Sequence, residues 1–269
     1  MTGKADRHTL ACSRSGFQRG WGRMRYTDED IAELKEIIGR SRRIVFFGGA
    51  GVSTASGIPD FRSEDGLYSG KWKGMSPEDV LSATYFALHT ADFYDFYRQY
   101  MLHPDAEPNI VHRWLYDLEK ADKLRGIVTQ NIDGLHRKAG NRRVYELHGN
   151  VHENYCINCD AEYPLEKITG CTGVPRCDRC GGLIKPWVVL YGESPDRYTC
   201  IGAEREITGA DTLIVAGTSL QVEPAASFIG YFSGKNLIVI NRETTPADEK
   251  ASLVIHADIE EVIAALASA

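Results

Sequence analysis

Two pairs of cysteines in the middle of the chain have the spacing of metal ligands. Cys156 and Cys159 form "CINC", Cys177 and Cys180 form "CDRC", and 17 residues separate the two pairs. A CxxC turn directs two thiolates at one point, and two such turns complete a tetrahedron of sulfur around zinc. Four protein ligands leave zinc no open position, so we expect one structural zinc ion. A redox-active pair is the alternative, and the second CxxC turn disfavours it.

A glycine-rich stretch, "GGAGVSTASGIPDFRS" at residues 48–63, follows the apolar residues "RIVFF". A loop that follows a buried strand can hold a phosphate with its backbone amides. The full G-x-G-x-x-G pattern is absent, because the third glycine comes late, at Gly57, and no acidic residue ends a second strand about 20 residues further on. We therefore predict a nucleotide site unlike that of an ordinary dehydrogenase. A glycine-rich turn without a ligand is the alternative.

Polar side chains follow another apolar run, in "TQNIDGLHRKAG" at residues 129–140. Gln130, Asn131 and Asp133 can face a crevice from the end of a strand, where an amide and a carboxylate could grip the amide of a nicotinamide or orient a water. Asn131 and Asp133 could instead merely cap the helix that follows. Both possibilities stay open at this point.

A single histidine, His148, lies beside a glycine in "YELHGN" at residues 145–150. A lone histidine is more often structural than catalytic. This one lies at the mouth of the crevice that the other strand ends predict. An imidazole titrates near neutrality, which suits a general base.

The elements that would position these residues alternate along the chain. Four apolar runs each end in a polar or glycine turn, and they are "RIVFFGG", "LRGIVTQNID", "DTLIVAGTSL" and "NLIVINRE". Helical patterns fall in "TDEDIAELKEIIGRSR", where Thr27 can cap the helix, in "NIVHRWLYDLEKAD" and in "IEEVIAALAS". This order predicts an α/β fold with a doubly wound parallel, Rossmann-like sheet. Ligands of such sheets bind beyond the carboxyl ends of the strands, so the polar turns should meet in one crevice.

Two inserted segments interrupt this alternation. We predict a helical insert at 62–126 and a zinc-ribbon insert at 151–184. The Rossmann-like domain then comprises 25–61, 127–150 and 185–269. Residues 1–24 are expected to be a disordered leader, or the result of a start placed too early, since Met24 directly precedes the first helical pattern. The aromatic run "YFALHTADFYDFYRQYM" predicts a packed core for the helical insert, with a ligand-binding wall as the alternative.

The composition is that of an ordinary globular protein of 269 residues, 43% hydrophobic and 25% charged. A net charge of -6 argues against a general nucleic-acid binder. No apolar stretch approaches the 18 or so residues of a membrane span, and the N-terminal segment lacks the apolar core of a secretory signal. We therefore expect a cytoplasmic protein. Seven cysteines, an odd number, weigh against a disulfide framework, and Cys12, Cys171 and Cys200 are expected to be bystanders. The oligomeric state stays open.

Taken together, the motifs resemble those of the sirtuins, a family of NAD-dependent protein lysine deacylases. "GAGVSTASGIPDFRS", "TQNIDGLHRKAG", "ELHGN", the two CxxC pairs, "GTSLQVEPAA" and "INRE" occur in that family's order, from about residue 27 to 267. The resemblance implies conversion of acyl-lysine and NAD to lysine, nicotinamide and O-acyl-ADP-ribose. A sirtuin-like mono-ADP-ribosyltransferase, a zinc-ribbon interaction module with a vestigial nucleotide fold and a dehydrogenase are the alternatives. The presence of His148 weighs against the first of these.

The resemblance also implies the roles of single residues. His148 would be the catalytic base, supported by Asn131 and Asp133. The NAD site would consist of Ala50, Gly51, Ser53, Phe61, Arg62, Gln130, Asn131, Asp133, Gly217, Thr218, Ser219, Asn241, Asp258 and Ile259. Val188, Val189, Tyr191 and Gly192 would pair with an acyl-lysine peptide by strand addition, which needs little side-chain recognition.

We predict that the acyl group on the substrate lysine is acetyl or another uncharged group, and that acidic acyl groups are disfavoured. Sirtuins that favour succinyl or malonyl lysine share a Tyr-x-x-Arg pair on the helical insert. Aligned on Tyr94, this chain has Tyr97 where the arginine would stand, and Arg98 comes one position late. In a helix, Arg98 would then point elsewhere.

Overall fold

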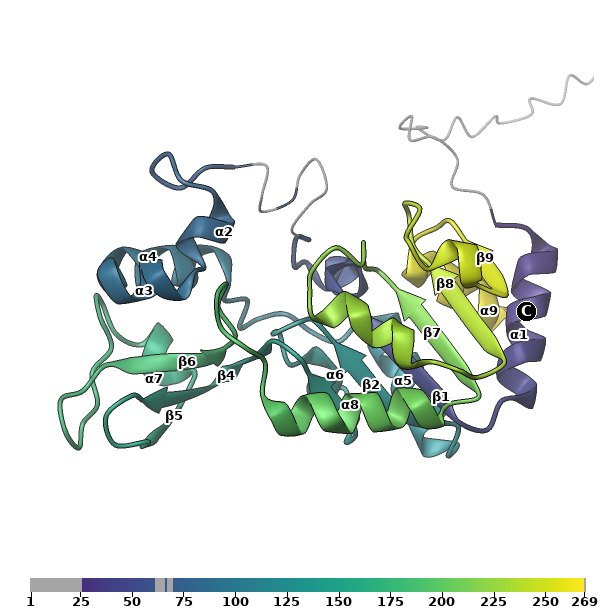
Figure 1. Ribbon diagram of the computed structural model, residues 1–269. Coiled ribbons are helices and arrows are strands. Elements are labelled where there is room, and N and C mark those ends of the chain that lie inside the picture. Colours follow the sequence, from purple (N-terminus) through teal and green to yellow (C-terminus); the bar gives the residue numbers. More distant parts are fainter. Residues whose placement is uncertain (1–25, 61–65, 67–69, 269) are drawn as a thin grey trace, which may run out of the picture.

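The computed structural model describes residues 26–60, 66 and 70–268. The larger part of the molecule is built on a six-stranded sheet of order β3-β2-β1-β7-β8-β9, in which every pairing is parallel (Figure 1). Its strands are β1 (Ile44–Gly48), β2 (Leu124–Thr129), β3 (Val144–Glu146), β7 (Thr212–Ala216), β8 (Asn236–Ile240) and β9 (Leu253–Ile255). The strand order reverses between β1 and β7. The predicted doubly wound sheet is therefore confirmed, and its switch point lies beside the glycine-rich loop.

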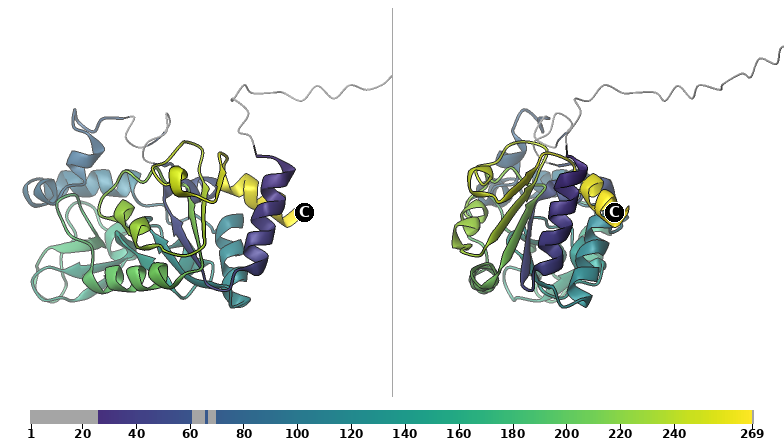
Figure 2. Two further views of the ribbon diagram at one scale, coloured as in Figure 1. Left: turned by 45° about the vertical axis from the view of Figure 1, so that its right-hand side comes forward. Right: turned by 90° about the vertical axis from the view of Figure 1, so that its right-hand side faces the viewer.

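Helices cover both faces of this sheet (Figure 2). One face carries α1 (Asp28–Arg40), α5 (Ile110–Lys120) and α9 (Ile259–Ser268), and the other carries α8 (Arg197–Gly209) and the 3-10 helix η4 (Ala225–Tyr231). Every residue of β1, β7 and β8 is buried, which explains why these strands read as unbroken apolar runs. Helix α1 begins as predicted, because the Thr27 side chain accepts a hydrogen bond from the Asp30 amide and Asp30 reciprocates.

The two inserted segments pack together as one small module. An antiparallel sheet of order β5-β4-β6 comprises β4 (Gly149–Cys156), β5 (Glu162–Pro164) and β6 (Ile184–Val188). The helices beside it are α2 (Pro77–Val80), α3 (Ala83–Leu88), α4 (Thr90–Tyr100) and α7 (Glu166–Thr169) (Figure 1). One apolar cluster joins them, and Phe86, Phe93, Tyr94 and Tyr97 of the aromatic run are buried in it. The aromatic run therefore forms a packed core.

The packing of α5 bears on the C-terminal boundary of the predicted helical insert. Helix α5 falls inside the predicted insert 62–126, yet Val111 and Leu115 are buried in the core of the large sheet, against α9 and β2. We therefore propose that the helical insert ends near Pro108 and that α5 belongs to the Rossmann-like domain. The predicted leader, 1–24, lies outside the described residues. None of the helices described is long and apolar enough to cross a membrane.

Two buried histidines, one on α5 and one on a short helix that follows β2, pack against each other. His112 of α5 and His136 of α6 (Leu135–Lys138) are 0% and 2% exposed, and their ring centroids lie 4.7 Å apart. Within the part of the chain that the structure describes, neither ring nitrogen of His136 has a hydrogen-bond partner. Burial lowers the pKa of His112 to about 4 and holds the pKa of His136 well below its ordinary value. Both rings are therefore neutral at neutral pH.

Acid should destabilise the fold through this pair. The folded-state pKa of each histidine lies below its unfolded value, so below about pH 6.5 the unfolded chain binds protons that the folded chain excludes. The stabilisation is complete above that pH and is lost as the pH falls. From pH 7 to pH 5, His112 alone should remove roughly 2 kcal/mol from the free energy of unfolding. Urea denaturation at both pH values measures this. His136→Leu should flatten the dependence, and an unchanged slope in that variant would contradict the assignment.

Candidate functional site

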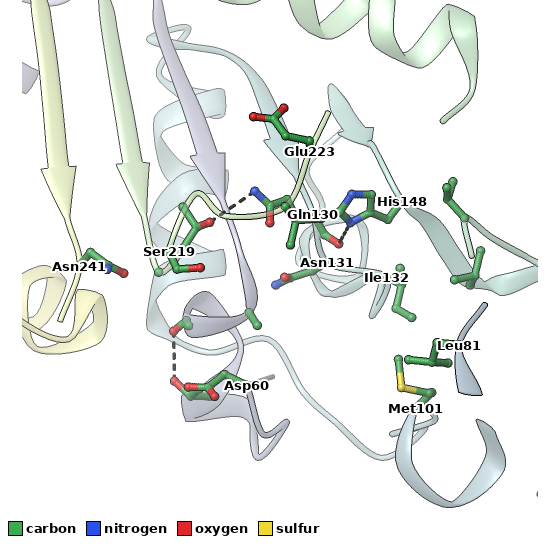
Figure 3. A pocket seen from close by; sticks show the side chains of 18 of the residues that line it. Asp60, Leu81, Met101, Gln130, Asn131, Ile132, His148, Ser219, Glu223 and Asn241 are labelled. Carbon is green, nitrogen blue, oxygen red and sulfur yellow. Dashed lines mark hydrogen bonds between the residues drawn. The ribbon is translucent and has the colours of Figure 1, made fainter. Parts of the chain in front are cut away.

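The carboxyl ends of the strands around the switch point open into one cavity of about 300 Å³ (Figure 3). Most of the predicted site residues line it, namely Ala50, Gly51, Gln130, Asn131, His148, Val188, Val189, Tyr191, Gly192, Gly217, Thr218, Ser219, Asn241, Asp258 and Ile259. Ser53 and Asp133 line an adjoining cavity of about 50 Å³, which shares Ala50 and Asn131 with the first. Phe61 and Arg62 lie outside the described residues.

The floor of the main cavity is backbone. The glycine-rich loop forms two short 3-10 turns, η1 (Ala50–Val52) and η2 (Thr54–Ser56), directly after β1. The Gly51 amide donates to the Gly217 carbonyl at 2.9 Å, and a Cβ on Gly51 would lie 2.8 Å from the Gly217 Cα. Gly217 has a φ of 59°, in the left-handed region. Only glycine fits at this crossing, which lets the backbones of the two loops approach closely at the cavity.

A polar cluster lies between the two cavities. Ser53 is 1% exposed and donates to Asp133 Oδ2 at 2.7 Å, while Asn131 Nδ2 donates to Ser53 Oγ at 3.0 Å. Burial raises the pKa of Asp133, against the opposing effect of its hydrogen bonds with Leu135 and Ser53. Asp133 Oδ1 also accepts the Leu135 amide at 2.8 Å, at the start of α6. Helix capping is thus one role of Asp133, whereas the Asn131 side chain binds Ser53 instead.

His148 is held as a neutral base. Its Nδ1 lies 3.0 Å from the Gln130 carbonyl oxygen (Figure 3). A carbonyl can only accept, so Nδ1 carries the proton and Nε2 carries the lone pair. Burial lowers the pKa of His148, although the hydrogen bond to Gln130 acts in the opposite direction. The imidazole is therefore neutral at neutral pH and can take a second proton at Nε2.

The residues predicted to hold a peptide form one wall of the cavity. The Val189 amide donates to the His148 carbonyl at 2.9 Å, the Tyr191 amide to the Leu81 carbonyl at 3.0 Å, and the Ala83 amide to the Tyr191 carbonyl at 3.0 Å. The segment 188–192 therefore connects the small module to the histidine loop.

Sequence reasoning missed the apolar end of the cavity. The side chains of Leu81, Met101 and Ile132 gather there, beside His148 (Figure 3). Leu81 and Met101 come from the helical insert, and nothing in their own sequence surroundings distinguishes them from core residues. Met101 and Ile132 also line the smaller cavity, so they separate the two.

The guanidinium of Arg98 is directed away from this end. It donates to the Ile168 carbonyl at 2.9 Å and to Cys171 Sγ at 3.2 Å, and Arg98 lines neither cavity. Tyr97, at the position where an arginine would meet an acidic acyl group, is fully buried. These positions agree with the expectation that Arg98 points elsewhere.

At the opposite end of the cavity, Asn241 and Ile259 lie beside an ion pair. Arg242 Nε donates to the carboxylate of Asp258, whose side chain is 15% exposed. Arg242 and its neighbour Glu243 line the cavity as well and were not predicted. The Asp258 carboxylate, which the resemblance places in the NAD site, is thus already oriented by the guanidinium of Arg242.

The four predicted metal ligands converge in the small module. All four Sγ atoms, of Cys156, Cys159, Cys177 and Cys180, lie within 4.8 Å of one another. Contacting pairs are 3.4 to 3.6 Å apart, close to the edge of roughly 3.8 Å that Zn–S bonds of about 2.3 Å would give a tetrahedron. The sulfurs are therefore placed to hold one zinc ion with no open position. Tyr163 adds a second layer, because its hydroxyl donates to Cys177 Sγ at 3.1 Å.

Comparison with known proteins identifies close relatives. Residues 49–224 match the family model described as "Sir2 family". A Clostridium acetobutylicum protein named NAD-dependent protein deacetylase is 52% identical over 237 residues, which cover 87% of this chain and 97% of that protein. A Cutibacterium acnes protein of the same name is 49% identical over 235 residues, covering 87% and 96%.

Solved structures show the same architecture. A Sir2 structure with a deacetylated p53 peptide and 3′-O-acetyl-ADP-ribose superposes with a TM-score of 0.82 at 36% identity, covering 88% of this chain and 97% of the other. A Sir2 structure with a p53 peptide and NAD+ gives 0.79 at 37% identity, and one with a propionylated peptide gives 0.78 at 36% identity. Both cover 88% of this chain and 97% of the other.

Replacing Tyr163 by Phe should speed the loss of zinc. The variant removes a hydrogen bond to the Cys177 thiolate, and outer-layer partners of this kind typically contribute tenfold or more to metal affinity. Release to a chromophoric chelator, followed in time, measures the effect. Tyr155→Phe is the matched control, since the Tyr155 hydroxyl makes no hydrogen bond to a cysteine sulfur among the residues described. Equal release from Tyr163→Phe and the unaltered protein would contradict the assignment.

Proposed function

The chain belongs to the Sir2 family and is an NAD-dependent protein deacetylase, and we propose that the cavity between the large sheet and the small module is its active site. The observation that carries this proposal is His148, which lies in the wall of that cavity with Nδ1 fixed and Nε2 basic. NAD supplies the ADP-ribosyl group that accepts the acetyl group, and one water is consumed, so that lysine, nicotinamide and O-acetyl-ADP-ribose are released. The relatives named NAD-dependent protein deacetylase weigh against the dehydrogenase and binding-module alternatives.

His148 would act as the general base. Its Nε2 takes a proton from a ribose hydroxyl, and that oxygen then becomes the acceptor of the acetyl group. The Gln130 carbonyl accepts from Nδ1–H throughout, so it keeps the ring oriented and stabilises the imidazolium that forms. The carbonyl does this without gaining or losing a proton itself.

The polar cluster of Ser53, Asn131 and Asp133 would bind the nicotinamide half of NAD. The three side chains hold one another in fixed orientation, and they lie where the small cavity meets the main one. A buried, hydrogen-bonded pocket of this kind keeps water away from the ribose carbon that nicotinamide leaves. Phe61 and Arg62 are proposed to complete this side of the site.

The rest of NAD would lie along the switch point. The diphosphate would lie against Ala50, Gly51 and Gly217, which have little or no side chain to exclude it, and beside the hydroxyls of Thr218 and Ser219. The adenosine half would then reach the group formed by Asn241, Asp258 and Ile259, where the ion pair with Arg242 fixes the carboxylate.

The substrate would be an acetylated protein or peptide that adds a strand beside residues 188–192. Its acyl-lysine would pass His148 and end against Leu81, Met101 and Ile132. These three side chains are uncharged, which favours acetyl or another uncharged acyl group. One solved relative was determined with a propionylated peptide, in agreement with an uncharged group at this position.

Mass spectrometry of an acetyl-lysine peptide incubated with and without NAD tests this function. The acetyl group should be lost only with NAD and should appear as O-acetyl-ADP-ribose. His148→Ala should lower kcat by roughly 100-fold or more, because it removes the base. His89→Ala is the control, an exposed histidine that lines neither cavity. NAD consumption with an untouched peptide would instead favour ADP-ribosyl transfer, and untouched NAD would count against an enzyme.

Arg98→Ala should leave the ratio of activity on succinyl and acetyl peptides within about twofold, because its guanidinium is bound to Ile168 and Cys171 and lies outside the cavity. Paired kcat/KM measurements on two peptides that differ only in the acyl group measure this ratio. Met101→Arg is the complementary variant, since it would place a cation at the apolar end and should raise the ratio. A selective loss of succinyl activity in Arg98→Ala would refute the assignment of the acyl end.

A further inference from the structure

The loop that would hold the diphosphate is fixed from three directions. The Gly217 turn binds it at Gly51, and the cluster with Asp133 binds it at Ser53. The third contact comes from Asn109, the residue that precedes α5 and that no motif in the sequence singled out.

The Asn109 side chain bonds in two directions at once. Its Nδ2 donates to the Val52 carbonyl at 2.8 Å and to Ser56 Oγ at 3.1 Å. Its Oδ1 accepts from the Val111 amide at 2.9 Å and from the His112 amide at 3.4 Å, which caps α5. The side chain is 8% exposed, and its donors and acceptor are all engaged. The amide nitrogen serves the loop and the oxygen serves the helix.

Asn109 binds two residues of the loop that do not line either cavity. Ala50, Gly51, Ser53 and Thr54 line the two cavities, whereas Val52 and Ser56 line neither. Asn109 does not line them either. Any effect of Asn109 on a bound nucleotide must therefore pass through the loop.

We propose that Asn109 is a positioning residue for NAD, which holds the residue 50–57 loop in the conformation that receives the diphosphate. The proposal rests on the proposed function of the cavity. Gly51 and Gly57 give this loop more backbone freedom than other residues would. A loop that is already ordered before binding loses less conformational entropy when the ligand binds, so the affinity is higher. The α5 helix, buried against the large sheet, supplies the rigid support.

The variant Asn109→Asp separates the two roles of the side chain. A carboxylate keeps the oxygen that caps α5 but has no proton to give to the Val52 carbonyl or to Ser56. We expect the KM for NAD and the Kd for ADP-ribose each to rise about tenfold, while the KM for an acetyl peptide at saturating NAD changes little. The melting temperature should fall as well, because the buried carboxylate has no proton to give to the Val52 carbonyl. Asn109→Ala loses both roles and should melt earlier too. Ser56→Ala removes one of the two loop contacts and should have a smaller effect of the same kind.

Thr27→Ala is the matched control, since Thr27 caps α1 and lines neither cavity, so its loss should lower stability without changing ADP-ribose binding. Unchanged NAD and ADP-ribose affinity in Asn109→Asp would overturn the proposal and leave Asn109 as a helix cap. An equal rise in the KM for NAD and the KM for the peptide would overturn it too, because that would mean that the variant perturbs the whole site. Calorimetry with ADP-ribose needs no turnover. Binding by an unaltered protein that fails to deacetylate would therefore count against the proposed function alone.

Discussion

The close crossing of two backbones at the sheet's switch point determines where everything else in the site can lie. Gly51 follows β1 and Gly217 follows β7, and the two meet with no room for a side chain between them. The contact brings the two loops together at the edge where the strands end. It also turns the rest of the glycine-rich loop toward β2, so that Ser53 reaches Asn131 and Asp133. A bulkier residue at either glycine would displace the proposed diphosphate floor and the polar cluster together.

The small module completes the site from the other side, and it depends on joining two distant stretches of chain. The aromatic core of the helical insert packs on the sheet that carries the cysteines, and together they present residues 188–192 and the apolar end of the cavity. Strands β4 and β6 pair at Gly149, where a Cβ would lie only 1.8 Å from the Trp187 carbonyl oxygen. This glycine directly follows His148. The same contact thus fixes the path of the proposed peptide strand and the position of the proposed base.

Sequence patterns predicted the features that depend on residues close to one another along the chain. Strands buried on both faces must be apolar throughout, helix α1 needs its cap, and two CxxC turns suit one zinc ion, so these features could be inferred from the sequence alone. The polar turns could be assigned to one crevice because parallel strands end at the same edge. Leu81 and Met101 could not, since their place in the cavity depends on how the inserts fold back on the sheet. The same holds for α5, which follows the insert in sequence but packs with the large sheet. It holds too for the contact of Asn109 with the glycine-rich loop, whose residues Val52 and Ser56 lie more than 50 positions away.

The site also shows how a buried polar pocket can be both stable and reactive. Burying polar groups is costly unless they are hydrogen-bonded, and here the side chains bind one another before any substrate arrives: Ser53 to Asp133, Asn131 to Ser53, His148 to Gln130. These bonds fix the orientation of each group, so little reorganisation is left for the reaction itself. Nε2 of His148 takes part in none of these bonds, which agrees with its proposed role as the proton acceptor. Because burial keeps the ring neutral, it is ready to accept a proton without first having to lose one.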